Sequence, residues 1–153
     1  MRRLSGVLLA GAILMLPAFS QNAGVLQAQA PQKLTMEGDL ALWSVAIRPD
    51  KTADFEKIMG KIKEALGKSE AAEAKQQLAG WRVVKMSKPM PDGNIIYTHV
   101  ITPVAGADYN ILQVLYATFT DPAEQKELYE MYRGAFAANL GISSGTVASD
   151  LSK

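Results

Sequence analysis

Residues 81–104 constrain the fold of this chain more than any other stretch, because they carry the pattern of a β-hairpin. Two arms rich in β-branched and aromatic residues, 81–88 and 94–104, flank a break of sequence Pro-Met-Pro-Asp-Gly. Proline fixes φ and glycine tolerates a positive φ, which are the properties that a turn requires. Helical patterns lie on both sides of the hairpin, so we expect an α+β domain.

Symmetric pairing of the two arms divides their side chains between two faces, because side chains alternate along a strand. The first face carries eight residues: Trp81, Val83, Lys85, Ser87, Ile95, Tyr97, His99 and Ile101. The second face is apolar in its middle, where it carries Val84, Met86, Ile96 and Val100. We therefore expect the helices to cover the second face and to leave the first one free.

The first face is where a function would lie. Trp81, Lys85, Tyr97 and His99 combine aromatic area with a few polar groups, which is typical of a small-molecule pocket. The same mixture is typical of a wet subunit interface, so both interpretations stand. These four residues are the candidate ligand-binding residues, and no catalytic residue is assigned.

Other patterns complete the domain. A strand is expected at 39–48 and a helix from Thr52 to about Leu66, followed by a short helix at 69–78. Beyond the hairpin, Asp108 is expected to cap a helix at 109–118. Another begins after Asp121-Pro122 and stops near 139–141. The expected order is β-α-α-β-β-α-α within residues 39–141, with a flexible arm at 31–38. Residues 142–153 are expected to form a flexible tail or a short edge strand.

Residues 1–30 have the pattern of a secretory signal peptide. Arg2 and Arg3 precede an apolar run at 4–19 that holds no acidic residue. The run is shorter than the ~20 residues that span a bilayer. Cleavage after Ser20 and cleavage after Ala30 both fit the small-residue rule. We expect an exported protein, periplasmic or extracellular, with no membrane segment once the signal peptide is removed.

Composition narrows the chemistry. The chain has no cysteine and one histidine, His99, which argues against disulfides, thiol catalysis, zinc sites and serine–histidine machinery. We predict no metal and no cofactor; a haem held by His99 alone is physically conceivable, but a lone histidine in a strand is more often structural. Removing Arg2 and Arg3 from the 16 basic residues leaves 14 against 15 acidic ones, a net charge of −1. Nucleic-acid binding is therefore not expected.

The order of these patterns resembles the ferredoxin-like core of the dimeric α+β barrel superfamily, which includes the antibiotic-biosynthesis-monooxygenase-like proteins. The features that carry the resemblance are the strand 42–48 ending in Pro49, the helix 55–66, Gly80-Trp81 before the hairpin, and Asp121-Pro122. The resemblance implies a homodimer built from antiparallel sheets, with helices on one face and ligands over the other. The chain departs from the pattern in its additional helix at 109–118 and in a last strand that is missing or displaced toward Gly145.

The leading hypothesis is an exported, dimeric α+β protein that binds a small apolar or aromatic molecule without catalysis. A second hypothesis is a cofactor-independent oxygenase-like enzyme acting on an aromatic or polyketide-like substrate, which His99 or Tyr97 would position. A third is a structural domain whose dimer interface occupies the same face. The sequence leaves open whether the protein is an enzyme.

Overall fold

A four-stranded antiparallel sheet and four helices make up the described part of the chain, residues 32–151 of the computed structural model. The strands are β1 (Leu40–Ile47), β2 (Trp81–Lys85), β3 (Ile95–Ile101) and β4 (Phe136–Gly145). The helices are α1 (Thr52–Lys68), α2 (Ala74–Gly80), α3 (Ile111–Thr118) and α4 (Pro122–Ala135), with a 3₁₀ turn at Pro49–Lys51. The predicted α+β class is confirmed. The predicted signal peptide, residues 1–30, lies outside the described residues.

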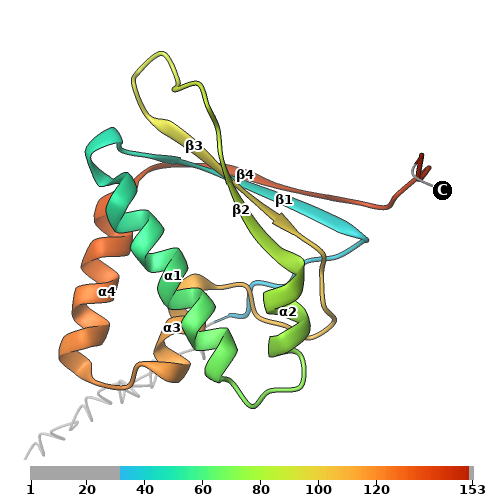
Figure 1. Ribbon diagram of the computed structural model, residues 1–153, viewed down its shortest axis with the longest axis horizontal. Coiled ribbons are helices and arrows are strands. Elements are labelled where there is room, and N and C mark those ends of the chain that lie inside the picture. The colour runs from blue at the N-terminus through green and yellow to red at the C-terminus, as the bar shows by residue number, and fades with distance from the viewer. Residues whose placement is uncertain (1–31, 152–153) are drawn as a thin grey trace, which may run out of the picture. The chain divides into compact units, whose positions relative to one another are not determined.

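The strands follow the order β2-β3-β1-β4, which places β1 and β3 at the centre of the sheet. Figure 1 views the sheet close to edge-on, with the helices together below the strands. The hairpin has the predicted register, since Trp81 pairs with Ile101, Val83 with His99 and Lys85 with Tyr97. β2 ends at Lys85, so the predicted pair further out does not form.

Local signals at the helix starts explain why α4 begins where the sequence predicts. The Asp121 carboxylate accepts hydrogen bonds from the backbone N–H groups of Ala123 (3.0 Å) and Glu124 (2.9 Å), and Pro122 follows it directly. Asn110 caps α3 instead of the expected Asp108. None of the helices in residues 32–151 is long and apolar enough to cross a membrane.

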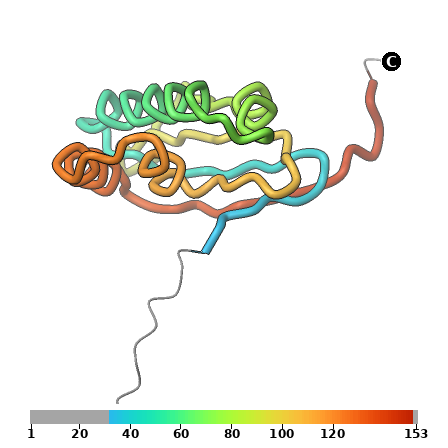
Figure 2. The backbone as a smooth tube through the Cα atoms, turned by 90° about the horizontal axis from the view of Figure 1, so that it is seen from below, coloured from blue at the N-terminus to red at the C-terminus, as the bar shows by residue number. Residues whose placement is uncertain are grey.

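The last strand is the main departure from the expected fold. A helix was expected to run to 139–141, whereas α4 ends at Ala135 and β4 takes residues 136–145 along the outer edge of β1. In Figure 2, β4 (red) lies beside β1 (cyan), and the chain after Gly145 continues past β1. The physical reason is non-local. β1 has a second edge whose backbone groups need partners, and Leu40 finds Gly145 there.

Gly38 and Gly145 contact each other where the start of β1 pairs with the end of β4. Gly38 has a φ of +81°, and a Cβ built on it would lie 2.5 Å from the carbonyl oxygen of Gly145. Only glycine fits that approach. Next to it, the backbone N–H of Asp39 donates to the Gly145 carbonyl at 2.9 Å, and the N–H of Val147 donates to the Asp39 carboxylate at 3.0 Å.

The segment expected to be a flexible arm makes defined contacts with the domain. The backbone N–H of Leu34 donates to the Asp108 carboxylate (3.0 Å), and its carbonyl accepts from the N–H of Tyr109 (2.8 Å). Met36 is buried and joins the core. The hydrogen bonds of Asp108 also explain why it does not cap α3, since it holds this segment instead.

The two faces of the hairpin are the reverse of the prediction. Val84 and Met86 were expected beneath the helices, but they are 44% and 39% exposed. Tyr97 and His99 are buried instead, with the ring of Phe55 from α1 centred 4.8 Å from the Tyr97 ring. The expectation that the helices cover Val84, Met86, Ile96 and Val100 is therefore wrong. The reason is that the aromatic face offers more area to bury, and its polar atoms, Nε2 of His99 apart, find hydrogen-bond partners within the protein.

Candidate functional site

The four candidate residues lie on one face of the sheet, as predicted, but that face is the one against which α1 packs. They form two separate groups. Trp81 and His99 make one hydrogen-bonded pair, and Lys85 and Tyr97 share a carboxylate, Glu56, that the sequence interpretation missed.

The first group is a buried histidine enclosed by aromatic rings. The indole N–H of Trp81 donates to Nδ1 of His99 at 3.0 Å. The Trp43 ring stacks on the imidazole with centroids 4.6 Å apart, and the Phe55 ring meets it edge-on at 6.1 Å. The sheet register places His99 opposite Val83 on β2 and opposite Trp43 on β1.

The hydrogen bond from Trp81 fixes the tautomer of His99. An indole N–H can only donate, so Nδ1 carries the lone pair and Nε2 carries the proton of the neutral ring. His99 has no exposed surface, and this burial lowers its pKa from 6.5 to about 4. Nε2 is buried and has no hydrogen-bond partner among the described residues. At neutral pH the ring is therefore uncharged and held in one tautomer.

The second group is an ionic cluster at the edge of the sheet. One oxygen of Glu56, in α1, accepts from the Tyr97 hydroxyl at 2.6 Å and from the Lys85 ammonium at 2.9 Å. These two hydrogen bonds, the Tyr97 one foremost, lower the pKa of Glu56. Burial, followed by the hydrogen bond to Glu56, raises the pKa of Tyr97. The side chains of Glu56 and Lys85 are half exposed, so solvent screens this cluster.

A pocket opens beside Trp81, between α1, α2 and β2. Its volume is about 370 Å³. Its lining consists of Met59, Ile62, Lys63, Leu66, Leu78, Trp81 and Val83. Trp81 is the one candidate residue on this lining, and its hydrogen bond to His99 sets the position of its indole ring. The helix that carries Met59, Ile62 and Leu66 was predicted, but no local pattern indicated that these residues would border a cavity.

Two other hollows in the described residues carry more charged side chains on their linings. One, of about 230 Å³, lies between α1, α2 and α3 and includes Lys33, Glu73 and Asp108 on its lining. A more open one beside α4 includes Arg48, Glu130 and Arg133. Within residues 32–151, no group of three or more histidine, aspartate or glutamate side chains is placed to hold a metal ion.

Comparisons of the chain with protein-family models, curated proteins and solved structures found no match. The site's own geometry therefore carries the functional argument.

Proposed function

We propose that this domain binds a small, largely apolar molecule in the pocket beside Trp81, without catalysing a reaction on it. The observation that supports it most is the lining of that pocket. Apolar side chains from two helices and one strand converge there with a single indole ring and a single charge. Small-molecule sites are commonly built in this way, from apolar and aromatic walls with few polar groups.

The state of the nearby polar groups favours binding over catalysis. A general base works best when its pKa lies near the operating pH, whereas burial lowers the pKa of His99 to about 4. Nδ1 of His99 is already engaged by Trp81, and the hydroxyl of Tyr97 is engaged by Glu56. The alternative, an oxygenase-like enzyme in which His99 or Tyr97 positions the substrate, would need these groups to be released.

A titration with Nile red, a neutral apolar dye, tests this proposal. We expect saturable fluorescence enhancement with one dye per chain in the mature protein. Leu78→Trp should fill the pocket and abolish dye binding, since Leu78 is on the lining. Leu42→Trp makes the same change on the opposite sheet face and should leave it intact. Absence of saturable binding, or loss in the Leu42 variant alone, would overturn the proposal.

A second candidate function is homodimerisation through the sheet face opposite α1. Large apolar side chains there are exposed, among them Leu40, Leu42, Val84 and Met86. β1 and β3 carry no acidic or basic residue other than His99, which is buried. An exposed apolar area of this kind, which has Arg82 on β2 as a charged residue on the same face as Val84, commonly marks an association site and suits a second copy of itself. The strand order and the chain order of α1 and α4 also support the ferredoxin-like dimeric arrangement that the sequence resembles.

Sedimentation velocity checks this second candidate. The mature protein should sediment as a dimer and Leu42→Glu as a monomer, because a carboxylate would be buried at the centre of the interface. Leu151→Glu is the matched control, since Leu151 is almost fully exposed near the end of the chain. A monomeric wild-type protein would rule this candidate out.

We also propose that the protein is exported, on the pattern of residues 1–30. N-terminal sequencing of the protein recovered outside the cytoplasm should begin at Gln21 or at Pro31. Full-length protein retained in the cytoplasm would contradict this.

A further inference from the structure

The charge on the pocket lining indicates the class of ligand. We propose that the pocket beside Trp81 takes an anionic amphiphile, an apolar chain or ring that carries one carboxylate, and that Lys63 pairs with the carboxylate. This inference rests on the proposed binding function and narrows it. Lys63 is the single charged residue among the seven that line the pocket.

Lys63 differs from the other lysines of α1 in having no anionic partner. Lys57 lies 3.6 Å from a carboxylate oxygen of Glu127, Lys61 lies 3.2 Å from one of Glu124, and Lys68 lies 2.7 Å from one of Glu64. The side chain of Lys63 forms no hydrogen bond or ion pair with any residue in 32–151. Its ammonium group is therefore available to a bound anion.

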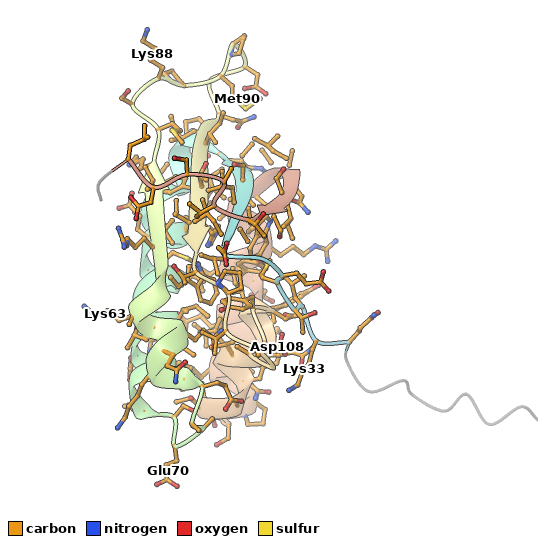
Figure 3. All side chains as sticks on the ribbon, turned by 90° about the vertical axis from the view of Figure 1, so that its right-hand side faces the viewer. Lys33, Lys63, Glu70, Lys88, Met90 and Asp108 are labelled. Carbon is orange, nitrogen blue, oxygen red and sulfur yellow. The ribbon has the colours of Figure 1, made fainter. Side chains whose placement is uncertain are left out.

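The position of Lys63 on α1 suits that role. Residues three and four apart share one side of a helix, so Lys63 lies between Met59 and Leu66 on the side that faces the pocket. A lysine stem packs along apolar surface while its ammonium group reaches water. Figure 3 shows the Lys63 side chain at the outer surface, pointing away from the ribbon. The arrangement gives an apolar interior with a positive charge at its mouth.

A carboxylate fits this arrangement better than a phosphate or a cation. Phosphate sites usually gather several donors, such as an arginine fork or a helix N-terminus, whereas this lining supplies one ammonium group. A cationic ligand would be repelled by Lys63. A neutral apolar ligand would form no ion pair with the Lys63 ammonium group.

Isothermal titration calorimetry with decanoate and 1-decanol, which share a chain length and differ in charge, tests the inference. We expect the mature protein to bind decanoate about tenfold more tightly than decanol, the difference expected of one charge-assisted contact. Lys63→Met should remove that preference by weakening decanoate binding about tenfold. Lys88→Met is the matched control, because it removes the same charge at the tip of the hairpin, far from Lys63 (Figure 3), and should keep the preference.

The possible results separate the two proposals. Equal affinity for decanoate and decanol in the wild-type protein would overturn the carboxylate inference and leave the binding function standing. Binding of neither probe would overturn both. An equal loss in the Lys63 and Lys88 variants would show that net charge, and not a contact with Lys63, sets the preference.

Discussion

Two hydrogen-bonded groups on the same face of β3 differ sharply in their surroundings. His99 is enclosed by Trp43, Phe55 and Trp81, whereas Tyr97, two residues away, reaches Glu56 and the solvent-exposed Lys85. Burial sets the protonation of the histidine, while hydrogen bonds set that of Glu56. The comparison teaches that the distance to solvent, and not the strand face, decides whether a polar side chain acts as part of the core or as part of a surface cluster.

The largest effect should come from removing the buried ring. His99→Ala should lower the free energy of unfolding by about 3 to 4 kcal/mol, because it opens a cavity among three aromatic rings and leaves the Trp81 N–H without its acceptor. Chemical denaturation measures this. His99→Phe keeps most of the ring volume and should cost clearly less. A loss below about 1 kcal/mol in the alanine variant would show that the ring is not a core element.

The pH dependence of stability should separate the two groups next. The pKa of His99 is about 4 in the folded protein and near 6.5 when unfolded, so between these values only the unfolded chain binds the proton. The contribution of the neutral, buried His99 to the free energy of unfolding is therefore fully present above pH 6.5. It is lost as the pH falls toward 4, by up to about 3 kcal/mol.

Comparing denaturation curves of the wild-type protein and His99→Phe across this pH range isolates the histidine. In the variant, the free energy of unfolding should lack the decrease between pH 6.5 and 4 that the histidine causes. Glu56 has a lowered pKa, so its contribution is present above its ordinary value of 4.5 and is lost only below it. Identical slopes in the two proteins would contradict the burial of His99.

The smallest effect should come from the exposed cluster. Tyr97→Phe keeps the ring beside Phe55 and removes the hydrogen bond to Glu56, which should cost about 1 kcal/mol. Tyr116→Phe is the control, since the Tyr116 hydroxyl makes a long 3.4 Å hydrogen bond to the Gln125 carbonyl and should cost less. Thermal unfolding compares the two. A cost for Tyr97→Phe above that of His99→Ala would reverse the comparison.

The sequence predicted the parts of the fold that local signals control. The hairpin register followed from alternation about a Pro- and Gly-containing turn, and the start of α4 followed from Asp121 and Pro122. Most of β4 was missed, because the pattern Phe-Ala-Ala-Asn-Leu-Gly-Ile-Ser-Ser-Gly has little strand propensity; only its end, 142–145, lies in the segment where a short edge strand was one of two alternatives. Residues 136–145 form a strand because they pair with the open edge of β1, and no local pattern indicates that pairing.

The candidate site was predicted in part. The sequence grouped Trp81, Lys85, Tyr97 and His99 on one face but left that face to a ligand or a subunit interface, because the opposite face is apolar in its middle. In the structure this face packs against α1, and its polar atoms, Nε2 of His99 apart, find hydrogen-bond partners in Glu56 and within the group. Glu56 was missed because it sits among the charged residues of α1, where no spacing distinguishes it from a solvated side chain.

The close approach of Gly38 and Gly145 has a consequence for how the chain reaches its fold. The two residues come from opposite ends of the domain, so the contact between them forms only after a long loop of chain has closed. While the protein is being synthesised, β1 exists long before its partner β4 does. Its outer edge then stays unpaired until residues 136–145 emerge. The completed pairing of β1 with β4 is therefore a late event, and the interval before it is the stage most exposed to aggregation.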